Sequence, residues 1–332
     1  MTMQPLLELD ELVVRYPVAR GLVGTLARRP KESVHAVDGV SLAVGAGEML
    51  ALVGESGCGK TSTAQAVMRL VESESGAVRF EGRDLAGLGT RKLRPLRRRV
   101  QMIYQDPYES LDPRLRVRAT VEEPLVIHHL GGSKSEREQR VREALARVEL
   151  TPPELYLDRY PHELSGGQRQ RVAIAAALVL EPLLLVADEP VSMLDVSVRA
   201  GVLSLLDALK RDGLAVLMIT HDLSTAARFA DRIAVMYLGK VVEEGSAAEV
   251  VRNPQHPYTK ALLSVVPRRD PRERPTAQVL RGETPDAVHV PTGCRFHPRC
   301  PVAVAACRTD EPELRAPQAP HAAGHRAACL LA

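Results

Sequence analysis

The stretch Gly54-Glu55-Ser56-Gly57-Cys58-Gly59-Lys60-Thr61 decides the fold of this chain. It fits the pattern G-x-x-x-x-G-K-[ST], follows an apolar run at 49–53 and precedes a helical pattern at 60–71. Glycines let the backbone curl so that successive N–H groups point inward, and a helix that starts here adds its positive end. The pattern predicts a phosphate-binding loop in which Lys60 reaches the β- and γ-phosphates and the Thr61 hydroxyl binds Mg²⁺.

Short runs that are apolar on both faces alternate with helical patterns along the chain. The expected strands are 49–53, 100–104, 183–187, 214–220 and 232–237. The clearest helical patterns are 60–71, 167–180 and 196–210. Apolar strands separated by helices predict an α/β fold with a mostly parallel sheet that is covered on both sides.

Three regions depart from this alternation. Residues 115–162 predict a small helical insertion without strands, and residues 17–33 predict a basic surface loop. Half of the 24 prolines lie after residue 250. We therefore expect one domain over 1–250, with a helical part at about 106–180, and a C-terminal extension over 251–332.

Composition excludes several classes of protein. The 332 residues are 45% hydrophobic and 26% charged, which excludes a disordered or collagen-like chain. A net charge of +3 is too small for a nucleic-acid footprint, so we expect no nucleic-acid partner. The longest apolar run, 172–187, is interrupted by Glu181 and Pro182, and the first residues lack the features of a secretory signal. A cytosolic chain is expected.

Two further motifs carry chemistry. The apolar run 183–187 ends in Asp188 and Glu189, where the first carboxylate suits Mg²⁺ and the second can polarise a water. Leu164-Ser165-Gly166-Gly167-Gln168 precedes a helical pattern, with a serine suited to the helix N-cap.

Together these motifs resemble those of the ATP-binding subunits of ABC transporters, over essentially the whole chain. Gln105 in MIYQDPYESLDPR matches the Q-loop, the segment 192–195 the D-loop and His221 in ITHDL the H-loop. The resemblance implies an ABC-type P-loop NTPase fold with an additional antiparallel β part. It also implies that ATP and Mg²⁺ are the cofactors and that Tyr16 stacks on adenine. The implied nucleotide contacts are Tyr16, Gly54, Glu55, Ser56, Gly57, Cys58, Gly59, Lys60, Thr61, Ser62, Gln105, Ser165, Gly166, Gly167, Gln168, Asp188 and Asp195.

The same resemblance implies a mechanism that needs two ATPase subunits. A second subunit closes the site with the equivalents of Ser165 and Gly167, while Gln105 and His221 contact the γ-phosphate or the attacking water. Glu189 is the implied general base, and the implied Mg²⁺ ligands are Thr61, Gln105 and Asp188. Met193 stands where the family usually has Ala, which predicts a looser subunit contact, and Ala176 stands where it usually has Arg, which removes an ion pair and predicts weaker hydrolysis. The nucleotide-contacting residues are all present, so an active ATPase is expected.

The run NPQHPYTKALLS at 253–264 is similar to the C-terminal extension of oligopeptide/dipeptide importer ATPases. That similarity implies a peripheral subunit at the cytoplasmic side of the cell membrane. Its partners would be two integral membrane permease subunits, a second ATPase of the same or a related kind and, indirectly, an external solute-binding protein. The alternatives are a non-peptide solute such as nickel or sugar oligomers, a soluble ABC ATPase of repair or translation, and a non-catalytic binding module.

Four cysteines lie near the C-terminus, with the spacing C-x5-C-x6-C-x21-C. This spacing matches neither a zinc ribbon nor a ferredoxin run, so unligated thiols, zinc and iron–sulfur all remain open. The runs GCRFHPRCP and GHRAAC resemble the tail of peptide-importer ATPases, some of which hold an iron–sulfur cluster. The resemblance therefore implies a [4Fe-4S] cluster on Cys294, Cys300, Cys307 and Cys329. Inside the phosphate loop, Cys58 is expected to be a small filling residue.

Overall fold

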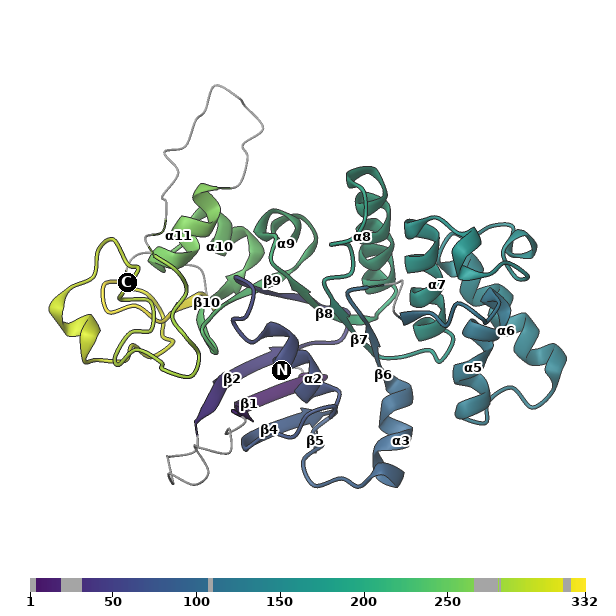
Figure 1. Cartoon of the computed structure of the whole chain (residues 1–332), viewed down its shortest axis with the longest axis horizontal. Helices are drawn as coiled ribbons and strands as arrows, with labels where there is room; N and C mark the ends of the chain where they lie inside the picture. Colours follow the sequence, from purple (N-terminus) through teal and green to yellow (C-terminus); the bar gives the residue numbers. More distant parts are fainter. Residues whose placement is uncertain (1–3, 19–31, 107–109, 266–279, 281, 319–323) are drawn as a thin grey trace, which may run out of the picture. The chain divides into compact units, whose positions relative to one another are not determined.

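The computed structural model describes residues 4–18, 32–106, 110–265, 280, 282–318 and 324–332. The chain forms two compact units, whose elements are labelled in Figure 1. Unit 1 comprises Met1–Leu7, Val44–Met49 and Gly87–Ile219, and unit 2 comprises Glu8–Ala43, Leu50–Ala86 and Thr220–Ala332. Most of the predicted basic loop at 17–33 lies outside the described residues. The predicted domain boundary at residue 250 stays a prediction.

Unit 1 contains three neighbouring parallel strands, in the order β6-β7-β8. They are β6 (Val100–Ile103), β7 (Leu184–Asp188) and β8 (Ala215–Thr220). Val100 pairs with Leu184, which in turn pairs with Ala215. The apolar residues of β7 are all fully buried, so the prediction of strands that are apolar on both faces is confirmed here.

A helical region follows β6 within unit 1, as the sequence predicts for 115–162. Its helices α5 (Val117–Ile127) and α6 (Lys134–Arg147) contact each other and α7 (Gly166–Leu178). Two 3₁₀ turns, η1 (Pro153–Leu155) and η2 (Pro161–Glu163), connect α6 to α7. Buried side chains such as Val121, Leu125 and Leu145 form the core between the helices.

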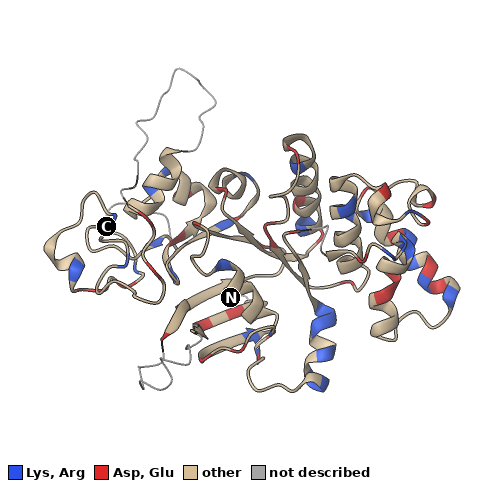
Figure 2. Ribbon diagram, in the orientation of Figure 1, with Lys and Arg blue, Asp and Glu red and all other residues tan. Residues whose placement is uncertain are grey.

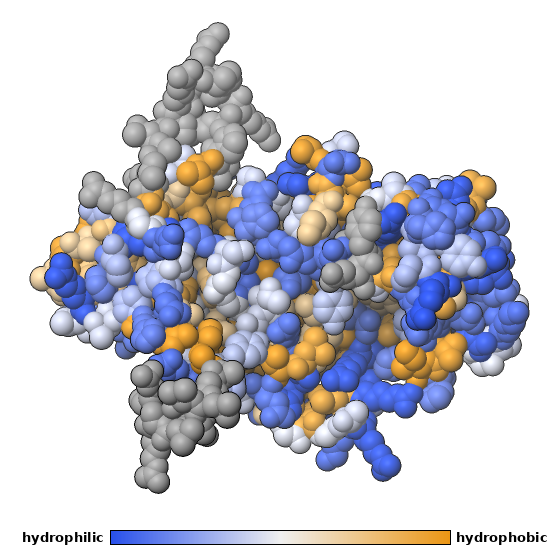
Figure 3. All heavy atoms as spheres, in the orientation of Figure 1, coloured by the Kyte–Doolittle hydropathy of each residue, from blue (hydrophilic) through white to orange (hydrophobic). Residues whose placement is uncertain are grey.

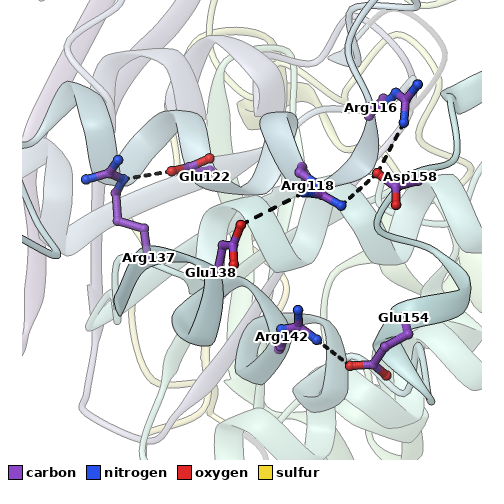
Figure 4. A network of polar contacts seen from close by, with 8 residues as sticks. All are labelled: Arg116, Arg118, Glu122, Arg137, Glu138, Arg142, Glu154 and Asp158. Carbon is purple, nitrogen blue, oxygen red and sulfur yellow. Dashed lines mark hydrogen bonds and ion pairs between the residues drawn. The ribbon is translucent and has the colours of Figure 1, made fainter. Parts of the chain in front are cut away.

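The surface of this helical region is mainly hydrophilic on the face drawn in Figure 3. Figure 4 shows ion pairs that join its elements, including Arg137 Nε to Glu122 Oε1 at 2.7 Å and Arg118 Nη2 to Asp158 Oδ1 at 2.7 Å. Because these side chains are partly exposed, each pair contributes little, about 0–1 kcal/mol. The buried apolar contacts therefore hold the region together.

Two more helices complete unit 1. Helix α3 (Thr90–Arg99) packs against β6, and its charged residues are all Lys or Arg (Figure 2). Helix α8 (Val196–Arg211) packs against α7 and buries Val202 and Leu206.

Unit 2 contains two groups of strands. In the first, β3 (Met49–Val53) runs parallel to β9 (Arg232–Tyr237), which pairs antiparallel with β10 (Lys240–Ser246), and β10 pairs with β11 (Arg326–Ala327). The second is a four-stranded sheet in the order β2-β1-β4-β5. Its strands are β1 (Leu7–Pro17), β2 (Ser33–Val44), β4 (Ser75–Phe80) and β5 (Arg83–Asp84).

The helices of unit 2 are short. They are α2 (Lys60–Val67), α9 (Leu223–Phe229), α10 (Ala247–Arg252), α11 (Pro257–Ser264) and the 3₁₀ turn η3 (Ala305–Arg308). Across the described part of the chain, no helix combines the length and the apolar character that crossing a membrane requires.

One buried carboxylate attaches the C-terminal extension to β10. Glu243 Oε1 lies 2.8 Å from His325 Nε2, and both side chains are fully buried. The same carboxylate accepts the backbone N–H groups of Gln255, at 2.7 Å, and His256, at 2.9 Å. Glu243 therefore binds both the beginning and the end of the extension.

His256 makes the stability of this junction depend on pH. The residue is the N-cap of α11, and its Nδ1 accepts the N–H of Tyr258 at 3.1 Å. Burial lowers the pKa of His256 from 6.5 to about 4, although Glu243 acts in the opposite direction. Because the folded pKa is depressed, this stability is present above pH 6.5 and is lost as the pH falls towards 4.

We expect protonation of His256 to remove about 3 kcal/mol of the free energy of unfolding between pH 7 and pH 4. The His256→Asn variant keeps a capping side chain but loses the titrating ring. Urea denaturation at pH 7, 5.5 and 4 should give a shallower pH dependence for the variant than for the wild type. If the free energy of unfolding depends on pH equally in the variant and the wild type, His256 is not the titrating group.

Candidate nucleotide-binding site

In unit 2, the loop between β3 and α2 has a backbone that requires glycine at particular positions. Gly59, the N-cap of α2, has φ +106°, and Gly57 has φ +79°. A Cβ on Gly59 would lie 1.9 Å from the carbonyl oxygen of Ala36, and a Cβ on Gly54 would lie 2.2 Å from that of Met236. The backbones of β2 and β9 thus approach the loop too closely for any side chain at either position.

Lys60 lies inside this loop and is 5% exposed. Its Nζ donates to the carbonyl oxygens of Gly54, at 2.8 Å, and Glu55, at 2.9 Å. Burial raises the pKa of the neighbouring Cys58 thiol, although Lys60 acts in the opposite direction. Cys58 is 1% exposed and therefore remains a protonated, buried thiol.

Tyr16 lies near the end of β1, beside the first residues of α2. Its hydroxyl donates to Gln65 Oε1 at 3.3 Å and lies 3.4 Å from Ser62 Oγ. The aromatic ring and the phosphate loop therefore belong to one part of unit 2. The stacking of Tyr16 on adenine stays a prediction.

Unit 1 brings together three of the predicted residues. Asp188 ends β7 and is 5% exposed, and Glu189 follows it with φ +45°. Gln105 Nε2 donates to Glu189 Oε2 at 3.2 Å. Gln105 and Asp188 line a hollow of about 570 Å³, together with Tyr104, Asp106, Ser110 and Met193.

The predicted capping serine is confirmed at the N-terminus of α7. Ser165 Oγ accepts the Gln168 N–H at 3.3 Å, and Gln168 Oε1 accepts the Ser165 N–H at 3.0 Å. A Cβ on Gly167 would lie 2.2 Å from Val198 Cγ1, so the contact of α7 with α8 requires a glycine there. This arrangement leaves the exposed Ser165 at the first turn of a well-formed helix.

Asp195 and His221 each lie at the beginning of a helix. Asp195 is the N-cap of α8, and its carbonyl oxygen accepts the Arg199 N–H at 2.8 Å. His221 is exposed and directly precedes Asp222, which caps α9 by accepting the Ser224 N–H at 2.9 Å. The roles of Asp195 and His221 stay predictions.

Glu55 has partners that the sequence reasoning missed. Its backbone N–H donates to the Tyr258 hydroxyl at 2.9 Å, and its carboxylate binds Thr284 Oγ1 at 2.9 Å and Arg299 Nη1 at 2.7 Å. Tyr258 and Arg299 lie 203 and 244 residues further along the chain. No local motif could have indicated such contacts.

The four C-terminal cysteines are neighbours. Burial raises the pKa of Cys294 to about 11, and the thiols of Cys307, Cys329 and Cys300 add to the rise. The Cys294 N–H also donates to the Cys307 carbonyl oxygen at 2.9 Å. Within the described ranges, however, no group of three or more His, Cys, Asp or Glu side chains is placed to hold a metal ion. The predicted [4Fe-4S] cluster therefore has no support from the side-chain geometry.

Comparisons with known proteins cover most of the chain. Residues 37–192 match the family described as "ABC transporter", and residues 242–307 match "Oligopeptide/dipeptide transporter, C-terminal region". The chain is 45% identical over 331 residues to a putative peptide import ATP-binding protein of Brucella ovis, with 99% of both chains covered. It is 44% identical to the oligopeptide transport ATP-binding protein AppF of Bacillus subtilis, over 99% of this chain and 98% of AppF.

The fold agrees with solved structures as well. A dimeric, post-hydrolysis structure of the ATP-binding cassette MJ0796 with ADP and Pi has a TM-score of 0.63 and 31% identity, covering 73% of this chain and 98% of that one. The cbiO1 protein of Clostridium perfringens has a TM-score of 0.63 and 28% identity, covering 75% of this chain and 91% of that one.

Replacing Gly59 with alanine should destroy the phosphate loop, because the new Cβ collides with the Ala36 carbonyl. Gly213→Ala is the matched control, since Gly213 has φ +100° but the described residues leave open space around a Cβ there. We expect Gly59→Ala to abolish binding of a fluorescent ATP analogue. Gly213→Ala should cost only the backbone strain of about 1–2 kcal/mol and bind normally. Equal ATP binding by the two variants would argue against the steric explanation.

Proposed function

Because the chain belongs to the ABC transporter family of ATP-binding subunits, in its oligopeptide/dipeptide branch, we propose that it hydrolyses ATP to drive the uptake of oligopeptides or dipeptides. The observation that carries this proposal is the match of residues 242–307 to the C-terminal region of oligopeptide/dipeptide transporters. A region of this description favours a role in transport over one in DNA repair or translation. A non-peptide solute, such as nickel or sugar oligomers, is the second candidate within the same branch.

The phosphate loop is proposed to bind the ATP phosphates. Its amides and the N-terminus of α2 supply positive potential, and Lys60 already lies within the loop, bound to carbonyl oxygens that phosphate oxygens can replace. We assign Mg²⁺ to Thr61, Gln105 and Asp188, which carry oxygen ligands of the kind that this ion prefers. When bound, Mg²⁺ would neutralise developing charge on the phosphates.

Glu189 is proposed as the general base. The Gln105 amide binds its carboxylate at 3.2 Å, and its N–H donates to the Ile219 carbonyl at 2.9 Å, so both side chain and backbone are oriented. A positioned carboxylate that takes a proton from the attacking water contributes about 10²–10⁴ in rate. The proposed role of His221 is to contact the γ-phosphate or this water.

A second ATPase subunit is proposed to complete the site. The N-terminus of α7 offers Ser165 and the positive end of a helix, which suits a phosphate bound by another subunit. Val196, the first residue of the neighbouring helix α8, is 81% exposed, and an apolar side chain exposed in this way suits a subunit contact. The dimeric state of the similar cassette MJ0796 supports the same arrangement. The partner is either a second copy or a related ATPase.

The proposed partners beyond the ATPase pair follow from the family. They are two integral membrane permease subunits, beneath which this chain would act at the cytoplasmic side of the cell membrane, and indirectly an external solute-binding protein. The segment that follows Gln105, residues 106–130, is the proposed permease contact.

On the resemblance of the tail alone, we propose an iron–sulfur cluster on the four C-terminal cysteines. If it is correct, anaerobic purification yields brown protein with about four iron atoms per chain and four cysteine ligands. Colourless protein without bound iron would remove the cluster from the proposal.

The experiment that tests the function compares Glu189→Gln with the wild type in the complete importer. We expect the variant to bind ATP and co-purify with the permease subunits, but to lose at least 10²-fold in ATP hydrolysis and to import no labelled peptide. The control is Glu154→Gln, which removes the carboxylate of a surface pair with Arg142. If Glu189→Gln hydrolyses ATP at nearly the wild-type rate, Glu189 is not the general base. Coupled uptake of another solute class but not of peptide would favour the second candidate.

A further inference from the structure

We propose that Tyr258, Thr284 and Arg299 of the C-terminal extension are positioning residues that hold the phosphate loop in its anion-binding form and neutralise Glu55. This inference rests on the proposed ATPase function and deepens it. The extension would then act directly on the affinity for ATP, in addition to any role in assembly.

The first observation concerns the backbone of Glu55, the second residue of the loop. Its N–H donates to the Tyr258 hydroxyl at 2.9 Å, and its carbonyl oxygen accepts Lys60 Nζ at 2.9 Å. The backbone N–H and carbonyl groups of Glu55 are therefore both hydrogen-bonded, and the peptide planes on either side of this residue have a defined orientation. Since phosphate binding depends on the direction of loop amides, the Tyr258 hydroxyl takes part in setting that direction.

The second observation concerns the carboxylate of Glu55. Arg299 donates from Nη1 to Oε2 at 2.7 Å and from Nη2 to Oε1 at 3.2 Å, and Thr284 Oγ1 donates to Oε2 at 2.9 Å. This is the two-pronged geometry in which guanidinium binds a carboxylate most strongly. Burial would raise the pKa of Glu55, but the hydrogen bonds from Arg299 and Thr284 outweigh it, and the pKa is lowered. Glu55 is therefore ionised at neutral pH.

An ionised carboxylate in a loop that binds polyphosphate is unfavourable, because like charges repel at short range. Arg299 pairs this charge and, with Thr284, draws the side chain towards the extension. The Arg299 side chain is 8% exposed and that of Glu55 28%, so water screens the pair only in part. Without Arg299, the negative charge of Glu55 would act on the bound phosphates.

The third observation is that the positioning groups are themselves rigid. Tyr258 is fully buried and packs against Tyr237 of β9, with ring centroids 4.7 Å apart, and against Phe296 at 5.4 Å. The Arg299 guanidinium lies over the Tyr237 ring, 5.9 Å from its centroid. Aromatic packing of this kind limits the freedom of each group, which is what a positioning role requires.

The test measures ATP binding and steady-state hydrolysis of the full-length chain in the assembled importer. For Arg299→Ala we expect a rise of about tenfold in the Kd of a fluorescent ATP analogue and in the KM for ATP, with kcat within twofold of the wild type. For Tyr258→Phe, which removes only the hydroxyl that accepts the loop N–H, we expect a rise of about fivefold in KM.

The decisive variant is the double substitution Arg299→Ala with Glu55→Gln. If repulsion by an unpaired carboxylate weakens binding, the double variant binds ATP at least threefold more tightly than Arg299→Ala alone. A purely structural role for the pair predicts no such rescue. The matched control is Arg326→Gln, which breaks a different ion pair between extension and core, Arg326 to Glu244 at 2.6 Å, and should leave KM unchanged.

Three results would overturn the inference while the wild type still hydrolyses ATP. They are an unchanged KM in both Arg299→Ala and Tyr258→Phe, an equal rise in the Arg326→Gln control, and no rescue in the double variant. Should Arg299→Ala fail to fold, as judged by thermal unfolding, Tyr258→Phe decides the question by its KM. A wild-type importer that neither binds nor hydrolyses ATP would refute the proposed function instead.

Discussion

The close approach of two backbone carbonyls to two glycines is the constraint on which the nucleotide site depends. Ala36 of β2 and Met236 of β9 lie so near to Gly59 and Gly54 that neither position can carry a Cβ. Packing at interior density transmits small shifts, because there is little free space to absorb them. The loop is thus shaped by the strands around it.

The C-terminal extension adds a second level of constraint to the same loop. It is attached to β10 through Glu243, which binds His325 and the backbone of the α11 N-terminus. From this anchored position it presents Tyr258 and Arg299 to Glu55. A region that the sequence alone presents as a separate tail therefore shares a buried polar network with the phosphate loop. Networks of this kind are strong when every member is paired and costly when one is lost.

In unit 1, the strand ends bring together the carboxylates for which we propose a catalytic role. Here, the carboxyl end of a fully buried strand places Asp188 and Glu189, and the loop after the neighbouring strand supplies Gln105. Parallel strands bring such ends to one edge of a sheet, so polar residues that are distant in sequence meet there. The polar residues lie only at the end of β7, and the rest of this strand is apolar and buried.

The sequence by itself determined the local elements and motifs. The glycines and Lys60 of the phosphate loop, the acidic end of β7, the cap formed by Ser165 and Gln168 and the helices at 115–162 are all encoded by contiguous residues, whose spacing reflects backbone periodicity and turn geometry. Tertiary structure alone decided which residues of the extension meet Glu55, because contacts across 203 and 244 residues depend on how the elements pack. It also decided the arrangement of the four C-terminal cysteines, since spacing along a chain with little regular structure does not determine where thiols point.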